Sequence, residues 1–178
     1  MKKQMNVKRL CLCALFAALT AVCTQIQIPM GPVPVTLSLL PVLLCASLLK
    51  KSYAALAMLV YMLMGLIGLP VFSGMAGGPG KLFGVTGGYI IGYIPCAFLA
   101  AWIIEKWGRT YGKQCMAMAV GVLACYAFGT AWFMITKGTA LWPSLTMCVI
   151  PFLPGDAVKI LLAAFMGQRL EKAVRVAV

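Results

Sequence analysis

Two ionisable side chains inside a long apolar stretch are the residues best placed to do chemistry in this sequence. Asp156 and Lys159 are three positions apart, so on a helix they share one face. In a membrane each ion at mid-bilayer costs about 2.5–3.5 kcal/mol on insertion scales, which favours a position facing protein or water. A carboxylate accepts hydrogen bonds and an ammonium donates them, so the pair predicts a polar binding site. The alternative is an ion pair that only joins helices.

A glycine-rich segment, residues 74–89, is the second candidate site. Around Gly80 and Lys81 it resembles a phosphate loop, but Met75 stands where that motif needs Gly and Leu82 where it needs Ser or Thr. The segment therefore encodes no nucleotide site. Any ATP-driven work requires another subunit.

The same segment offers backbone and aromatic contacts to a small solute. Glycine allows a ligand to approach the backbone closely. An aromatic ring of the segment can stack on the same ligand. The candidate substrate contacts are Phe83, Gly84, Thr86, Gly87, Gly88 and Tyr89. The alternative is close helix packing, because Gly84, Gly88 and Gly92 recur at four-residue spacing.

Small residues on the first apolar run form a possible docking face. Ala14 and Ala18, and likewise Ala17 and Ala21, are small residues four positions apart. Such pairs let another helix approach closely. They predict either a surface for a partner protein or packing within the chain.

Composition identifies the class of protein that must position these residues. Of 178 residues, 63% are hydrophobic and 10% charged, and the mean hydropathy is +0.99. Soluble domains have about 45–50% apolar and about 25% charged residues, so a soluble fold is excluded. A bilayer span needs about 20 apolar residues, so this length allows about six. We predict a single membrane-embedded domain over residues 1–178.

The apolar runs predict an all-α integral membrane protein with six transmembrane helices. They are long, continuous and rich in Ala, Leu and Met, so strands are not expected. Cleavage of the first run as a lipoprotein signal is disfavoured, because Val22 precedes Cys23 and the run continues to Ile28. The runs are at about 10–28, 35–49, 52–69, 87–104, 115–136 and 146–168.

The basic residues predict the orientation of these helices. Twelve of the fifteen lie at the termini and in the second and fourth connections, whereas only Lys81 and Lys137 lie in the opposite connections. The positive-inside rule then places both termini in the cytoplasm of a multi-pass cell-membrane protein. The outer connections are 29–36, 70–86 and about 137–145, and they are rich in Pro and Gly, with six of the ten Pro and seven of the eighteen Gly. The basic residues on the inner side are Lys2, Lys3, Lys8, Arg9, Lys50, Lys51, Lys106, Arg109, Lys113, Arg169, Lys172 and Arg175.

The sequence lacks the residues that several other functional classes require. The sequence has no His, no C-x-x-C pair and no Gly-x-Ser-x-Gly elbow, so neither a metal site nor catalytic residues are predicted. The net charge of +12 does not indicate nucleic-acid binding, because no soluble domain presents it. We interpret the eight Cys as small packing residues. No cofactor is expected.

Taken in order, these motifs resemble the biotin-specific S components, the BioY family, of energy-coupling-factor (ECF) vitamin transporters. The resemblance covers nearly the whole chain. Two positions depart from the family pattern: Ser38 replaces a frequent Gln, and Val85 replaces a common Pro. The resemblance rests on the first-run alanines, Gly31-Pro32-Val33-Pro34-Val35-Thr36-Leu37, Gly68-Leu69-Pro70-Val71-Phe72, Thr86-Gly87-Gly88-Tyr89 and Pro151-Phe152-Leu153-Pro154-Gly155-Asp156 with Lys159.

The resemblance implies that the chain captures biotin on its outer side as a transported ligand. It implies contacts from Asp156 and Lys159, with Thr36 and Ser38 adding polar groups. It also implies docking through Ala14 and Ala18 onto a membrane T component that carries two cytoplasmic ATPases.

Three alternatives remain beside biotin capture. The same fold can serve another small vitamin, although the Pro-Gly-Asp-x-x-Lys and Thr-Gly-Gly-Tyr stretches argue against this. A small membrane enzyme acting on a lipid is expected to have a second acid or a metal cluster. A purely structural subunit has no use for an outward polar pair.

Overall fold

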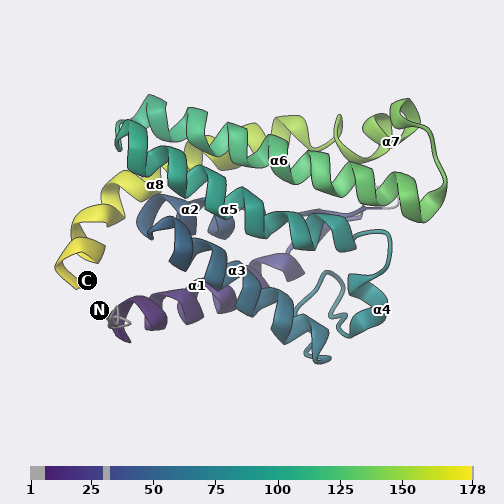
Figure 1. The fold of residues 1–178 in the computed structure, drawn as a ribbon, viewed down its shortest axis with the longest axis horizontal. Coiled ribbons are helices and arrows are strands. Elements are labelled where there is room, and N and C mark those ends of the chain that lie inside the picture. Colours follow the sequence, from purple (N-terminus) through teal and green to yellow (C-terminus); the bar gives the residue numbers. More distant parts are fainter. Residues whose placement is uncertain (1–6, 30–32, 178) are drawn as a thin grey trace.

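The computed structural model describes residues 7–29 and 33–177, which form an elongated helical bundle (Figure 1). Helix α1 begins, and helix α8 ends, at the same end of the bundle (Figure 1). Lys2, Lys3, Gly31 and Pro32 lie outside the described residues. The helices are α1 (Val7–Gln25), α2 (Leu39–Leu48), α3 (Lys51–Leu66), α4 (Pro79–Leu82), α5 (Gly87–Trp107), α6 (Tyr111–Lys137), α7 (Leu141–Cys148) and α8 (Leu153–Ala177).

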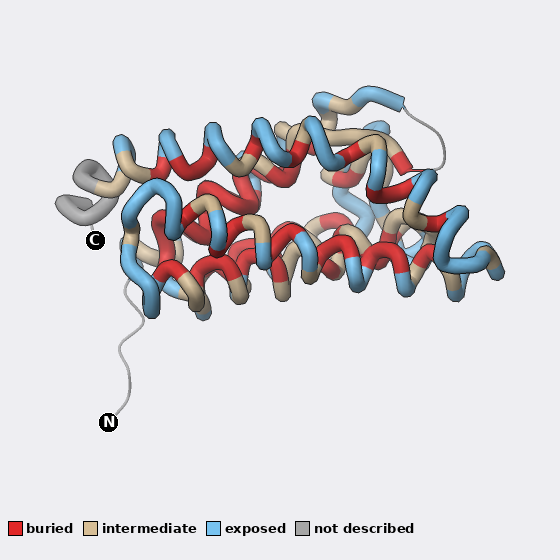
Figure 2. Tube along the Cα trace, turned by 90° about the horizontal axis from the view of Figure 1, so that it is seen from above, coloured by how far each residue is buried: buried red, intermediate tan, exposed pale blue. Residues whose placement is uncertain are grey.

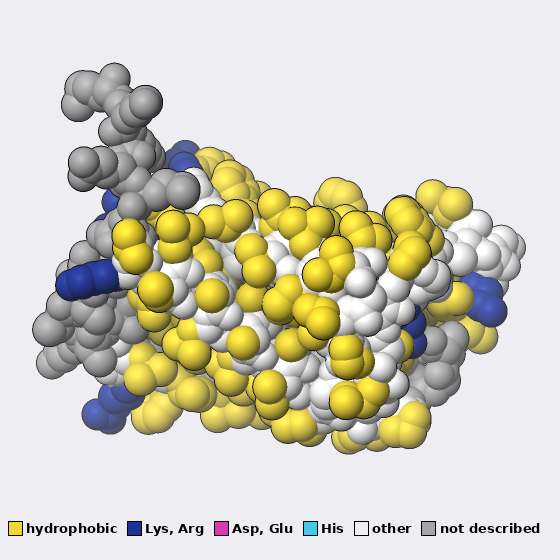
Figure 3. Space-filling view, turned by 90° about the horizontal axis from the view of Figure 1, so that it is seen from below, with side chains coloured by type: hydrophobic (Ala, Val, Ile, Leu, Met, Phe, Trp, Pro, Cys, Tyr) yellow, Lys and Arg dark blue, Asp and Glu magenta, His cyan; other side chains and the backbone are white. Residues whose placement is uncertain are grey.

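Within the described residues, three helices are long and apolar enough to cross a membrane: α1, α5 and α6. The bent pair α7–α8 makes a fourth if it is counted as one span. Helix α3 has 16 residues, about 24 Å at 1.5 Å per residue, less than the roughly 30 Å hydrocarbon core. In Figure 3 hydrophobic side chains cover the middle of the face shown, and Lys and Arg lie toward its ends. The protein is a multi-pass membrane protein, while the six-span count stays a prediction.

Helix α2 is the central helix of the bundle. Eight consecutive residues, Pro41–Leu48, are buried, so it is covered on all sides, as an apolar helix without a polar face must be. It packs against α1, α5 and α8. Elsewhere the buried residues line the inward faces of the helices (Figure 2). The core beneath the candidate site is therefore built around α2.

The sixth apolar run, expected as one helix, is broken in two. Helix α7 ends at Cys148, α8 begins at Leu153, and the two axes differ by 55°. Pro151 lies in the break, where its ring and missing N–H disfavour a continuous helix. The break places Asp156 in the first turn of α8, where the helix dipole favours negative charge.

The expectation that the chain has no strands is wrong for the first outer connection. Strands β1 (Gln27–Ile28) and β2 (Val35–Thr36) form a short antiparallel hairpin, with Gln27 opposite Thr36. After α1 ends, these backbone groups need partners, and pairing across the connection supplies them. The second run therefore begins as a strand, and its helix starts only at Leu39.

Gly87 is required by the close approach of the start of α5 to the end of α4. A Cβ at Gly87 would lie 1.6 Å from the backbone oxygen of Leu82. We expect Gly87→Ala to lower the melting temperature of the detergent-solubilised protein by about 3–10 °C, because the backbone must shift. Gly80→Ala is the control, since nothing lies within 4 Å of a Cβ at that position. Equal melting temperatures for the two variants would contradict the packing role.

Candidate substrate-binding site

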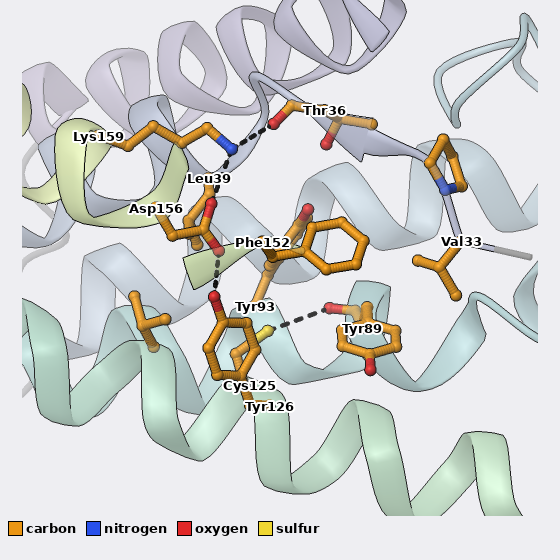
Figure 4. Close-up of a pocket in the computed structure, with 12 residues that line it drawn as sticks. Val33, Thr36, Leu39, Tyr89, Tyr93, Cys125, Tyr126, Phe152, Asp156 and Lys159 are labelled. Carbon is orange, nitrogen blue, oxygen red and sulfur yellow. Dashed lines mark hydrogen bonds and ion pairs between the residues drawn. The ribbon is translucent and has the colours of Figure 1, made fainter. Parts of the chain in front are cut away.

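The predicted pair Asp156 and Lys159 forms a buried ion pair. Lys159 Nζ lies 2.8 Å from Asp156 Oδ1, and the two residues are 8% and 5% exposed. Lys159 Nζ also donates to the backbone oxygen of Thr36 at 2.7 Å, which ties α8 to strand β2. Both side chains therefore face protein and a cavity, not the surface of the bundle (Figure 4).

Asp156 has a second partner from a different helix. The hydroxyl of Tyr126, on α6, donates to Asp156 Oδ2 at 2.5 Å (Figure 4). Both carboxylate oxygens thus accept a charge-assisted hydrogen bond, the type that is strongest in a dry interior. A fixed chain of donors and acceptors runs from α6 through α8 to the hairpin.

The ion pair lines a cavity of about 60 Å³, large enough for a few water molecules. Its walls combine the ion pair with aromatic rings and aliphatic groups from α2, α5, α6 and the hairpin (Figure 4). The lining residues are Val33, Pro34, Thr36, Leu39, Tyr89, Tyr93, Val122, Cys125, Tyr126, Phe152, Asp156 and Lys159.

A second cavity of about 40 Å³ adjoins the first and shares the rings of Tyr89 and Tyr93 with it. Its polar groups are hydroxyls, without a charged side chain in the lining. The lining residues are Thr24, Val33, Pro34, Thr36, Tyr61, Ser73, Thr86, Tyr89, Ile90 and Tyr93. The site therefore has a charged part and an uncharged, hydroxyl-rich part.

Thr36 and Ser38 belong to a chain of hydroxyl groups at the edge of both cavities. Thr36 Oγ1 and Ser38 Oγ are 2.5 Å apart, and Ser38 Oγ is 2.6 Å from the Tyr93 hydroxyl. Thr36 lines both cavities, whereas Ser38 is fully buried behind them. The short side chain of Ser38, which departs from the family pattern, thus holds the Tyr93 hydroxyl by a hydrogen bond.

The glycine-rich segment divides into lining and packing residues. Thr86 lines the second cavity and Tyr89 lines both. Gly84 accepts a hydrogen bond from Trp132 Nε1 at 3.0 Å, and a Cβ on Gly88 would lie 2.2 Å from Trp132 Cβ. Together with the contact of Gly87 on Leu82, these observations favour packing for the three glycines. Phe83 is 62% exposed and lines neither of these two cavities.

Sequence reasoning missed several lining residues, above all Tyr93 and Tyr126. Tyr93 is one helical turn from Tyr89, so the spacing alone puts it on the same face. Tyr126 is a hydroxyl-bearing residue within an apolar run, a signal that points to an internal partner because a lipid-facing hydroxyl has none. Contacts from Leu39, Val122 and Phe152 depend on helix packing and have no sequence signature.

The four alanines of α1 lie on two different faces. Ala14 and Ala18 are exposed, whereas Ala17 is buried with Tyr61 and Phe72 and Ala21 packs against the same cluster. Ala17 and Ala21 therefore serve internal packing. Ala14 and Ala18 are left facing outward.

Proteins named as biotin transporters are similar to this chain over nearly its whole length. The chain is 34% identical over 168 residues to a probable biotin transporter BioY of Pyrococcus horikoshii, covering 94% of this chain and 98% of the relative. It is 35% identical over 167 residues to the biotin transporter BioY of Thermotoga maritima, covering 93% and 97%.

A solved structure shares the fold. The S-component for biotin from an ECF-type ABC transporter superposes with a TM-score of 0.87 at 27% identity, covering 97% of this chain and 95% of that one. The model of the BioY family matches residues 1–176. The chain therefore belongs to the BioY family, whose members are transporter components and not enzymes.

Proposed function

We propose that this protein takes up biotin as the substrate-binding S component of an ECF-type transporter. The observation that carries the proposal is the buried Asp156–Lys159 pair lining an aromatic cavity. The family membership and the names of the relatives support the choice of biotin.

The ion pair matches the chemistry of a ureido group. Asp156 offers an acceptor next to the donor Lys159, and a ureido edge offers an N–H next to a C=O. In this proposal Asp156 accepts from the ureido N–H and Lys159 donates to the ureido oxygen. The pair is neutral overall, which suits a neutral group better than an anionic one. Tyr89 covers the ring system, and Thr36 and Thr86 add polar contacts from the edge.

The site has to expand to admit biotin. Pockets for ligands of this class have volumes of about 300–1,000 Å³, whereas the two adjoining cavities have about 60 and 40 Å³. The hairpin is held over the site by the bond from Lys159 to the Thr36 carbonyl. We propose that this contact opens on binding, so that connections 29–36 and 70–86 act as a lid that excludes water.

The orientation and partners complete the proposal. Six spans with cytoplasmic termini place the cavity toward the outside of the cell membrane, since the basic connections lie at the end away from the hairpin. The chain has no phosphate loop, so energy comes from a T component and its cytoplasmic ATPases. Ala14 and Ala18 on α1 form the proposed docking face.

Equilibrium binding of labelled biotin to the purified protein tests this function. Lipoate carries the same valerate tail but no ureido group, and thiamine shares neither. We expect neither compound to compete at a 100-fold excess, because the ion pair selects the ureido edge. Competition by thiamine would favour an S component for another vitamin. An absence of biotin binding would overturn the proposal.

A further inference from the structure

We propose that Tyr126 is a positioning residue for substrate binding: its hydroxyl fixes the Asp156 carboxylate and its ring separates the ion pair from an apolar surface groove. The proposal rests on the function proposed above. It concerns a residue that would act through Asp156 and need not touch the substrate.

The Tyr126 hydroxyl is the second of two donors that fix the orientation of the Asp156 carboxylate. Lys159 is on the same helix as Asp156 and bonds Oδ1 at 2.8 Å, while Tyr126 bonds Oδ2 at 2.5 Å from α6. The χ2 torsion of Asp is broad, so a donor on only one oxygen leaves the carboxylate plane free to turn. Donors on both oxygens, from two helices, fix that plane.

This restraint leaves the carboxylate able to bind a ligand. A carboxylate has about four acceptor positions, and Tyr126 and Lys159 use two of them. Asp156 lines the cavity, so its remaining acceptor capacity is available to a ligand N–H there. Tyr126 thus orients the acceptor without occupying all of it.

The ring of Tyr126 has a second neighbour, a groove of about 290 Å³ between α6 and α7. Leu123 and Leu141 in its lining are 62% and 56% exposed, so the groove opens on the apolar surface of the bundle. Tyr126 lines both this groove and the ion-pair cavity. The lining residues of the groove are Leu123, Tyr126, Ala127, Thr130, Ala131, Met134, Leu141, Leu145 and Val149.

The position of Tyr126 between the two spaces explains why the residue is a tyrosine. A buried ion pair is stable only while its hydrogen bonds are complete and its surroundings stay fixed. A phenylalanine keeps the barrier but loses the donor, and an alanine loses both. The two substitutions therefore separate the two parts of the proposal.

A double-mutant cycle tests the hydroxyl. We expect Tyr126→Phe to weaken biotin binding about tenfold in the wild type, but by no more than about twofold when Asp156 is already Asn. Tyr93→Phe is the control, because its hydroxyl bonds Ser38 and not Asp156. Its effect should be the same in both backgrounds. A Tyr126→Phe effect that is equal in both backgrounds, or absent, would overturn the positioning role.

The melting temperature of the same variants tests the ring. Tyr126→Phe should melt about 2–5 °C below the wild type, because the buried carboxylate loses one donor, whereas Tyr126→Ala should melt about 4–10 °C lower still, because it joins the cavity to the groove. Equal melting temperatures for the Phe and Ala variants would contradict the barrier. If the wild type binds no biotin, the proposed function fails; if it binds and only the cycle fails, Tyr126 alone is misassigned.

Discussion

Asp156→Asn is expected to weaken biotin binding by about 100-fold, since hydrogen bonds to charged groups contribute about 1.5–3 kcal/mol and tenfold corresponds to about 1.4 kcal/mol. The substitution removes the anionic acceptor for the ureido N–H. It also leaves the ammonium of Lys159, which is 8% exposed, without its counter-ion. Equilibrium binding of labelled biotin to the purified variant measures the loss.

Glu105→Gln is the matched control for this prediction. It makes the same chemical change at an exposed acid, whose Oε1 accepts from the backbone N–H of Lys51 at 2.9 Å. Glu105 lines neither cavity. Its affinity for biotin should equal that of the wild type. If Asp156→Asn also bound biotin as tightly as the wild type, the ion pair would have only a structural role and the proposed site would be wrong.

Replacing both Ala14 and Ala18 with Leu is expected to reduce energised uptake at least about tenfold while leaving biotin affinity unchanged. Leucine keeps the helix apolar, but its bulk prevents the close approach that small residues allow. Both alanines are exposed, so the fold tolerates the change. Ala17 is buried, so a leucine there would disturb the packing of this chain and would not test docking. Uptake of labelled biotin in cells that also express the T component and the two ATPases measures the effect, and co-purification of the T component with the variant measures docking.

Ala127→Leu is the control for the docking face. Ala127 is also exposed, but it lies on α6 beside the apolar groove. Uptake by this variant should remain at the wild-type level. Normal uptake by the Ala14, Ala18 double variant would show that the T component binds another surface.

The sequence predicted the long helices well because their apolar runs are continuous and bounded by charge or glycine. The predicted run 87–104 became α5, Gly87–Trp107, and 115–136 became most of α6, Tyr111–Lys137. The sequence did not predict the β1–β2 hairpin, because strands of two residues are too short to show an alternation of apolar and polar side chains. The break before α8 was missed although Pro151 was visible, since an apolar composition on both sides suggested one helix.

For the site, the sequence identified the groups that are costly to bury but not the groups that accompany them. Asp156 and Lys159 stand out because ions are rare in apolar segments. Tyr126 contacts Asp156 across 30 residues of sequence, and that pairing follows only from the packing of α6 on α8. The glycines of the 74–89 segment show the reverse case: their spacing allowed both ligand contact and packing, and contacts with Trp132 and Leu82 now favour packing.

Gln25, the last residue of α1, makes three hydrogen bonds to the second outer connection. Gln25 donates through Nε2 to the carbonyls of Pro70 and Phe72, at 3.4 and 3.2 Å, and accepts through Oε1 from the backbone N–H of Met75 at 3.0 Å. The connection held in this way includes Ser73, in the wall of the hydroxyl-rich cavity. A tilt of α1 would therefore be transmitted through these hydrogen bonds to one wall of that cavity. In the proposed transporter, Gln25 would thereby couple a movement of the docking helix to the shape of the binding site.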